Sequence, residues 1–360
     1  MNAVLETLDP TQVRERFHAA RTAGKRARDA AHSLGVSEGA ALAAHVGEHG
    51  YRLKVQALQG PWVELLKGLE ACGPVMALTR NESTVHEKTG VYQNVSANGG
   101  MGLALGEAID LRLFFTQWHA GFAVTELAND PANPPVLSLQ FYDAHGDAVH
   151  KVFTRDATDL AAFQALMDQH TANKVAYVFS TRPAPKPARP DADIDAQGLV
   201  AAWGAMTDTH QFFGLLRKFD VQREQALALV EGQFTSRLAL SSVRHVLYEA
   251  SLEGTPIMVF VGNPGCIQIH SGSVKRVEPM VSPSSQWINV LDADFNLHLR
   301  EDMVASAWAV EKPTEDGIVT SIEVFDREGE LMAMFFGVRK PGVPELQAWR
   351  DLVAGVPRLA

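Results

Sequence analysis

The two halves of this 360-residue chain resemble each other, and this internal repeat limits the fold more than any other feature of the sequence. Residues 75–92 match 257–274 with a shift of 182, and residues 137–153 match 320–336 with a shift of 183. The same order at nearly constant spacing indicates an internal duplication. The second pair shows strand, Asp-x-x-Gly turn and strand, which is typical of a β-hairpin. We therefore expect one fold built twice.

Each half begins with helical signals and then becomes rich in short strands. Residues 9–12 (Asp-Pro-Thr-Gln) are typical of a helix N-terminus, with an N-cap, a proline in the first turn and a capping box. In the second half, apolar residues and His210 recur at helical spacing over 199–213. Asp208 with Gln211 forms a second capping-box pattern, so His210 alternatively lies in the first turn of a new helix.

The strand runs are joined by hairpin turns without βαβ alternation, which favours antiparallel sheets. The expected fold class is α+β, a tandem duplication in which each repeat combines an antiparallel sheet with flanking helices. Four prolines in the polar segment 180–198 predict a stiff, extended linker. The predicted domains are therefore an N-terminal repeat over 1–179, this linker, and a C-terminal repeat over 199–360.

Composition narrows the classes of function. The chain has 32 Lys and Arg against 42 Asp and Glu, a formal charge of −10, which argues against nucleic acid as the main partner. Apolar runs are of strand length, and the first residues lack the apolar core of a signal peptide, so we expect no membrane insertion. Cys72 and Cys266 have no zinc or Cys-x-x-Cys spacing. These features favour a reduced, cytoplasmic protein.

Several catalytic motifs are missing. The sequence contains no P-loop and no Gly-x-Ser-x-Gly elbow, and the glycines of 100–106 have the wrong final spacing for a dinucleotide fingerprint. His86-Glu87 begins like a zinc-protease motif, but Gly90 stands where the second histidine belongs. A hydrolase or an NAD enzyme would therefore need chemistry that no motif marks.

His210 is the candidate that stands out. It lies in the stretch TDTHQFF, near Trp203, Met206 and Phe213. One interpretation is a core histidine that is hydrogen-bonded to a carbonyl group. The other is an axial ligand, because a neutral imidazole binds iron and a flat apolar macrocycle needs aromatic and aliphatic walls. The local pattern leaves both interpretations open.

Over residues 75–340 the sequence resembles the duplicated bacterial haem-utilisation proteins known as haemin-degrading factors. The combination of blocks in this order is specific, although no single block is. The matching stretches are RNESTVHEKTGVY (80–92), AIDLRLFFTQWHAGFAV (108–124), TDTHQFFGLLRKF (207–219), GNPGCIQIHSGSV (262–274) and INVLDADFNLHLRE (288–301).

The resemblance implies two repeats, each with a large antiparallel sheet and helices, and haem beside the C-terminal sheet. It implies that His210 is the axial ligand of the haem iron. It also implies a distal, catalytic role for Arg112 and contacts of Lys312 and Arg339 with the propionates. The alternatives are a surface charge on a strand for Arg112 and solvated loop charges for the other two.

The remaining histidines that we considered are expected to be structural. His86 is a candidate for a second haem site, but it aligns with Gln268 in the repeat rather than with His210. His145 and His150 flank a hairpin turn, where we expect them to be exposed. His270 lies in an alternating strand pattern, which is sufficient to explain it.

The resemblance therefore implies a cytoplasmic haem-binding protein of haem uptake and utilisation. As an enzyme, it would open the porphyrin ring oxidatively and release iron with electrons from a separate donor, because no flavin or nicotinamide motif is present. The alternative is a non-catalytic chaperone that hands haem to a separate haem oxygenase. A third interpretation is a duplicated binding module for another hydrophobic anion.

Overall fold

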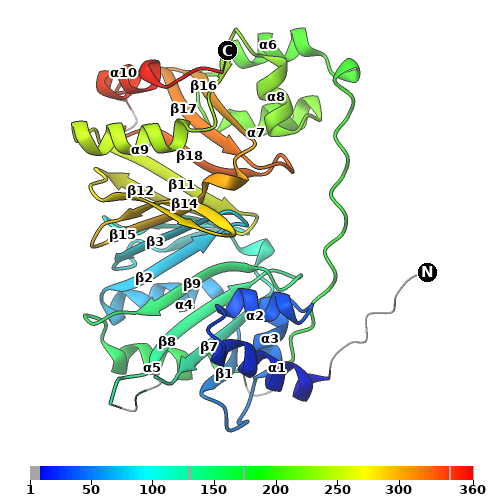
Figure 1. Ribbon diagram of the computed structural model, residues 1–360, viewed down its shortest axis with the longest axis vertical. Coiled ribbons are helices and arrows are strands. Elements are labelled where there is room, and N and C mark those ends of the chain that lie inside the picture. The colour runs from blue at the N-terminus through cyan, green and yellow to red at the C-terminus, as the bar shows by residue number, and fades with distance from the viewer. Residues whose placement is uncertain (1–8, 129, 131, 173–174, 340–341, 360) are drawn as a thin grey trace. The chain divides into compact units, whose positions relative to one another are not determined.

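A computed structural model describes residues 9–359, apart from 129, 131, 173–174 and 340–341. Its strands form two sheets of nine strands each, and helices flank the sheets (Figure 1). The expected α+β class and the tandem duplication are both confirmed. No helix in the described part of the chain is long and apolar enough to cross a membrane.

The chain divides into two compact units that exchange short segments. Unit 1 comprises 1–79, 88–183 and 263–267, and unit 2 comprises 80–87, 184–262 and 268–360. Each exchanged segment contains an asparagine that the sequence comparison had matched. Asn81 Nδ2 donates to the Met332 carbonyl at 2.9 Å within unit 2. Asn263 Nδ2 donates to the Val149 carbonyl at 2.8 Å within unit 1.

Unit 1 begins with three helices, continues with strand β1, and adds a helix before and after its remaining strands. Its antiparallel strand order is β1-β7-β8-β9-β2, with a second group β4-β5-β6. The elements are α1 (Pro10–Thr22), α2 (Ala27–Ser33), α3 (Glu38–Ala44), β1 (Leu53–Leu58), α4 (Trp62–Gly68), β2 (Val75–Arg80), β3 (Thr84–Gly90), β4 (Ser96–Asn98), β5 (Met101–Leu105), β6 (Asp110–Phe114), β7 (Ala120–Glu126), β8 (Val136–Tyr142), β9 (Ala148–Thr154) and α5 (Leu160–His170).

Unit 2 repeats this succession, although residues 84–87 of β3 belong to unit 2 and residues 266–267 of β12 belong to unit 1. Its antiparallel strand order is β10-β16-β17-β18-β11, with a second group β13-β14-β15. The elements are α6 (Ala196–Gly204), α7 (Gln211–Phe219), α8 (Arg223–Leu229), β10 (Thr235–Arg237), α9 (Ser242–Glu253), β11 (Ile257–Asn263), β12 (Cys266–Gly272), β13 (Val277–Ser282), β14 (Ser285–Leu291), β15 (Phe295–Arg300), β16 (Ser306–Thr314), β17 (Gly317–Phe325), β18 (Leu331–Gly337) and α10 (Gln347–Gly355).

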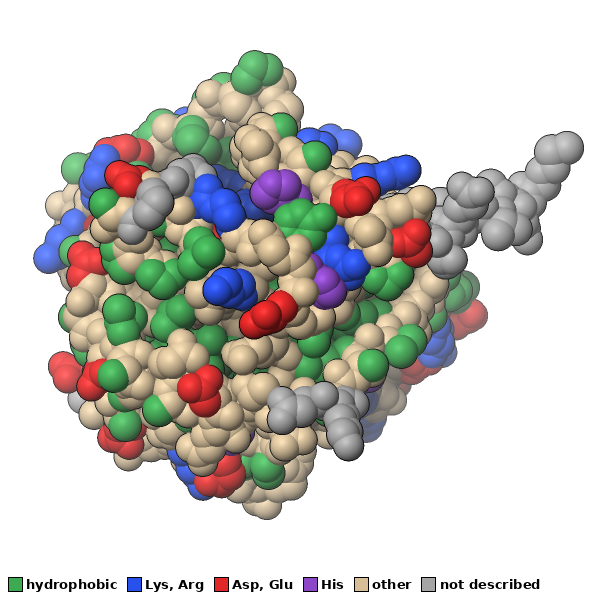
Figure 2. All heavy atoms as spheres, turned by 90° about the horizontal axis from the view of Figure 1, so that it is seen from below, with side chains coloured by type: hydrophobic (Ala, Val, Ile, Leu, Met, Phe, Trp, Pro, Cys, Tyr) green, Lys and Arg blue, Asp and Glu red, His purple; other side chains and the backbone are tan. Residues whose placement is uncertain are grey.

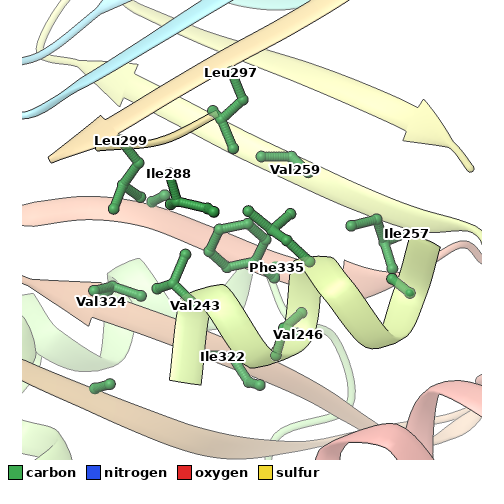
Figure 3. Packing of buried hydrophobic residues seen from close by; sticks show 14 of the residues in the cluster. Val243, Val246, Ile257, Val259, Ile288, Leu297, Leu299, Ile322, Val324 and Phe335 are labelled. Carbon is green, nitrogen blue, oxygen red and sulfur yellow. The ribbon is translucent and has the colours of Figure 1, made fainter. Parts of the chain in front are cut away.

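Alternation along β16 shows why helices cover both faces of the unit 2 sheet. Ala307 and Ala309 pack into the core formed with α9 and α10. Trp308 and Val310, which point to the opposite face, pack with α6, α7 and α8. Figure 3 shows the first of these cores, where α9 places Val243 and Val246 against strand residues. The second core positions the α6–α7 turn.

The matched Asp-x-x-Gly turns have the same geometry in both units. Asp143 Oδ1 accepts from the Asp147 backbone at 3.0 Å, and Asp326 Oδ1 accepts from the Glu330 backbone at 2.9 Å. The turn glycines, Gly146 and Gly329, have φ of 80° and 75°, where a side chain would be strained. The predicted hairpins are therefore confirmed.

The predicted helices are confirmed only in part. The Asp9 capping box forms and starts α1 at Pro10. The continuous helix expected over 199–213 is wrong, because α6 ends at Gly204 and α7 begins at Gln211. His210 is the N-cap residue of α7, directly before its first turn. This position is one residue from the alternative expectation, which placed His210 in the first turn of a new helix. Within the predicted linker 180–198, α6 already begins at Ala196.

A buried polar network in unit 1 contradicts the exposure expected for His150. Its Nε2 lies 2.6 Å from the Tyr92 hydroxyl and its Nδ1 lies 2.9 Å from Thr79 Oγ1, and all three side chains are buried. His145 is half-buried. Side chains on both faces of β9 are largely buried, so His150 lies inside unit 1, and desolvation lowers its pKa to about 3. The folded protein therefore holds a neutral imidazole here at neutral pH.

This network predicts a loss of stability in acid. Between pH 6.5 and about 3 the unfolded chain binds a proton at His150 that the folded chain does not, so the free energy of unfolding falls as pH falls. Chemical denaturation at pH 7 and 4.5 compares the parent with His150→Asn, which cannot titrate. We expect the difference in the free energy of unfolding between the parent and His150→Asn to change by about 3 kcal/mol from pH 7 to pH 4.5, to the parent's disadvantage. A constant difference would contradict a neutral buried imidazole.

Candidate functional site

His210 lies in the turn between α6 and α7, and its side chain is 90% exposed. The apolar residues on either side of it, Met206 and Phe212, are buried against the unit 2 sheet. Packing of these neighbours anchors the turn while the imidazole points to solvent. The alternative of a core histidine is therefore excluded.

Asp208 orients this imidazole. Asp208 Oδ1 accepts from His210 Nδ1 at 2.7 Å and from the His210 backbone nitrogen at 2.8 Å. These hydrogen bonds lower the pKa of Asp208, so the acceptor stays ionised. A proton held on Nδ1 leaves the lone pair on Nε2, the arrangement that carboxylates impose on metal-binding histidines.

Asp208 was predicted only as a capping residue, and the expected capping box is wrong in detail. Gln211 Oε1 accepts from the Thr207 backbone at 2.9 Å instead of from Asp208. The Asp-x-His spacing is a usable signal for the ring contact, since an aspartate often bonds groups two residues further along the chain.

Arg339 lies close to the same turn. Its positive charge contributes to the lowered pKa of Asp208, and its guanidinium lies 3.7 Å from Asp316. The β16–β17 turn that carries Asp316 also contacts the α6–α7 turn, because the Glu315 backbone donates to the Thr207 carbonyl at 2.9 Å. His210 and Arg339 are therefore brought together within unit 2.

Lys312 is buried in β16 rather than solvated in a loop. Its ammonium lies 2.6 Å from Glu323, and Arg223 bonds the same carboxylate at 2.7 and 2.9 Å. Burial alone would raise the pKa of Glu323, but the two cations lower it, so the carboxylate stays charged. Lys312 and Arg223 also lie over the Phe212 ring in α7, at 4.6 and 5.0 Å.

Two cations against one carboxylate leave an excess of positive charge beneath α7. Burial is the largest influence on Lys312 and lowers its pKa, while Glu323 opposes that effect. Sequence reasoning missed Arg223, since nothing in its surroundings marks it before the fold brings α8 against β17. This charge favours an anionic group on this side of unit 2.

Arg112 belongs to unit 1, whereas the other three predicted residues belong to unit 2. It lies in β6, its half-buried guanidinium forms an ion pair with Asp110, and its side chain is 34% exposed. This geometry fits the strand position expected from the sequence. The role of Arg112 stays a prediction.

A cavity of about 360 Å³ lies further along α7. Phe213, which is 62% exposed, lines it together with Leu216, Arg217 and the linker residues Lys186 and Arg189. An exposed aromatic ring one turn beyond His210 is one of the walls that the sequence predicted for a flat apolar ligand. This part of unit 2 therefore carries an exposed imidazole, an exposed aromatic ring and several cations along one helix and its neighbours.

His86 and His270, which were also considered above, are packed inside unit 2. His270 stacks on Phe295 at 3.8 Å between ring centroids, and His86 contacts the same ring at 4.9 Å. Both are buried in the sheet. This packing agrees with the structural role expected for them.

Known proteins share the whole of this architecture. The family model for the haemin-degrading HemS/ChuX domain matches twice, over residues 35–170 and 220–356. The chain is 39% identical over 336 residues to the hemin transport protein HmuS of Yersinia pestis, with 92% of each chain covered.

Two solved structures are similar along nearly their full length. Holo-PhuS, a heme-binding protein from Pseudomonas aeruginosa, has a TM-score of 0.91 and 43% identity, covering 98% of this chain and 100% of its own. ChuS, an E. coli heme oxygenase, has a TM-score of 0.83 and 35% identity, covering 96% of this chain and 99% of its own.

The ring contact predicts the tautomer of His210. Nitrogen NMR of histidine-labelled protein above neutral pH is expected to show His210 protonated at Nδ1. Asp208→Ala removes the acceptor and is expected to shift the population toward the Nε2-protonated form. Asp220→Ala, an exposed change at the other end of α7, serves as the control. The same tautomer mixture in parent and Asp208→Ala would contradict the orienting role.

Proposed function

The chain belongs to the haemin-degrading HemS/ChuX domain family, and on this basis we propose that unit 2 binds haem with His210 Nε2 as the axial ligand of the iron. The observation that carries this proposal is the exposed imidazole whose other nitrogen is held by Asp208 at 2.7 Å. An imidazole whose other nitrogen is hydrogen-bonded to an ionised carboxylate is a strong ligand for iron, and its exposure leaves room for a macrocycle.

Arg339 and Lys312 are the proposed partners of the haem propionates. Arg339 lies near His210, and its contact with Asp316 is long, at 3.7 Å, so its guanidinium can turn toward a carboxylate. Lys312 would act through the excess positive charge beneath α7, because its ammonium already bonds Glu323. The two cations therefore have different proposed roles. Arg339 would contact a propionate directly, whereas Lys312 would attract the propionates through its charge.

Arg112 is the proposed distal group, and this role rests on the family resemblance. A guanidinium keeps its protons at all physiological pH values, so it donates steadily to an oxygen atom near the iron. The ion pair with Asp110 would hold the side chain in one orientation. Such a donor contributes to the chemistry more than to the affinity.

For the activity, we propose oxidative opening of the porphyrin ring and release of iron, with electrons from a separate donor in the cytoplasm. The relative titled a heme oxygenase supports this choice. The relative named a transport protein supports the second candidate, a chaperone that hands haem to a separate oxygenase. The same binding site serves both functions.

His210→Ala is expected to weaken haem binding by about tenfold or more, which corresponds to about 1.4 kcal/mol, and to change the Soret band. Haemin titration followed by absorption measures both quantities. His32→Ala removes an exposed histidine from α2 and should behave like the parent. An unchanged affinity and spectrum in His210→Ala would overturn the axial assignment.

Treatment of the haem complex with a reductant distinguishes the two candidate activities, and Arg112→Ala tests the distal role. With ascorbate as the electron donor, we expect the parent to lose its Soret band and form a bilin. Arg112→Ala should slow this step by about 100-fold, while the haem affinity changes much less. Arg16→Ala removes an exposed arginine from α1 and should retain the rate of the parent. A stable Soret band in the parent would favour the chaperone, and equal losses of binding and rate would contradict a distal role.

A further inference from the structure

Unit 1 contains a cavity that the proposed haem site does not use. It has a volume of about 390 Å³ and lies between the α1–α2 turn, the segment before β1 and the end of β7. The turn contributes Arg21 and Lys25, the segment before β1 contributes His45, Tyr51 and Arg52, and Glu126 closes the β7 side. Every one of these side chains carries a polar or ionisable group.

Aromatic rings line the inner part of this cavity. Phe17 and Tyr51 contact the His45 ring, at centroid distances of 5.3 and 5.9 Å, and His18 contacts Tyr51 at 5.2 Å. Phe17 and His45 are buried. Edge and tilted contacts of this kind form a wall against which a further flat ring can pack.

His45 gives this wall a defined hydrogen-bonding character. Its Nδ1 donates to the Ala41 carbonyl at 2.7 Å, which leaves Nε2 as an acceptor. Burial lowers the pKa of His45, so the ring stays neutral at pH 7. A ligand with a hydroxyl group beside its ring can donate to this nitrogen.

Basic side chains surround the opening. Among the lining residues that the structure describes, Arg21, Lys25 and Arg52 accompany one carboxylate, Glu126, which pairs with Arg21, and Arg52 also donates to the Leu127 carbonyl. The lining is therefore cationic in a chain whose formal charge is −10. Figure 2, which views the end where Figure 1 places α1 and β1, shows histidine and basic side chains close together on this face. Such a local field attracts an anion against the average charge.

The cavity occupies the place in unit 1 that the His210 turn occupies in unit 2. The α1–α2 turn corresponds to the α6–α7 turn, and the end of β7 corresponds to the end of β16. Arg26 is the N-cap residue of α2, where His210 is the N-cap residue of α7. The corresponding position in unit 1 therefore borders a cavity and carries arginine where unit 2 carries His210.

We propose that this cavity binds an aromatic carboxylate smaller than haem, with its ring beside Phe17, His45 and Tyr51 and its carboxylate toward Lys25 and Arg52. The volume decides the size class. It equals about 13 water molecules at about 30 Å³ each. It also lies near the lower end of the range of small-molecule sites, about 300–1,000 Å³. A ligand with one or two rings would fill this space.

Histidine-labelled NMR with salicylate as the probe tests this proposal. Salicylate is expected to shift the His18 and His45 resonances saturably and to leave His210 unchanged. Lys25→Glu, an exposed change in the turn, should weaken this binding about tenfold, and Arg52→Ala should weaken it as well. Arg16→Ala, an exposed change on α1 away from the cavity, should bind like the parent. A thermal melt checks that each variant is folded.

Three results would overturn the proposal. Salicylate would have no site here if the shifts never saturated. The same would follow if Arg16→Ala and Lys25→Glu reduced the shifts equally. If cyclohexanecarboxylate bound as tightly as salicylate, the aromatic side chains would not select for an aromatic ring. Displacement of salicylate by one equivalent of haemin in His210→Ala would show that the cavity takes the macrocycle, against the size argument. Because His210 serves only unit 2, failure of the haem proposal leaves this test intact.

Discussion

The hydrogen bond between Asp208 and His210 is the interaction on which the functional account depends. An imidazole on the surface of a helix N-terminus would otherwise rotate and exchange its proton between two nitrogens. Asp208 holds one nitrogen at 2.7 Å, and Met206 and Phe212 anchor the turn on both sides. The remaining nitrogen, Nε2, is therefore presented to solvent, as an axial ligand requires.

The duplication supplies the scaffold twice, but the two copies have diverged in chemistry. In unit 2, a cationic cluster of Lys312 and Arg223 on Glu323 underlies the helix that follows His210. In unit 1, the equivalent turn borders a cavity lined by His45 and Tyr51. A repeated fold preserves places for ligands more readily than it preserves the ligands themselves, because packing fixes the turns while exposed side chains remain open to change.

The sequence predicted the duplication and the hairpins because Asp-x-x-Gly turns and strand alternation are local signals. It failed for His150, because its partners Tyr92 and Thr79 come from distant parts of the chain. It also joined α6 and α7, since helical spacing over 199–213 continues through a turn that only Asp208 reveals. His210 was singled out from its neighbours and from the family resemblance. Arg223 was not, because a cation's buried partner depends on tertiary structure.

The central claim concerns a bond between one nitrogen and iron, and resonance Raman spectroscopy of the ferrous haem complex measures that bond directly. With ¹⁵N-labelled histidine, the account predicts an iron–histidine stretching band that shifts with the label in the parent and is missing from His210→Ala. Asp208→Asn should lower its frequency, because a weaker acceptor leaves the imidazole a poorer donor to the metal. A label-sensitive band that persists unchanged in His210→Ala would contradict the account.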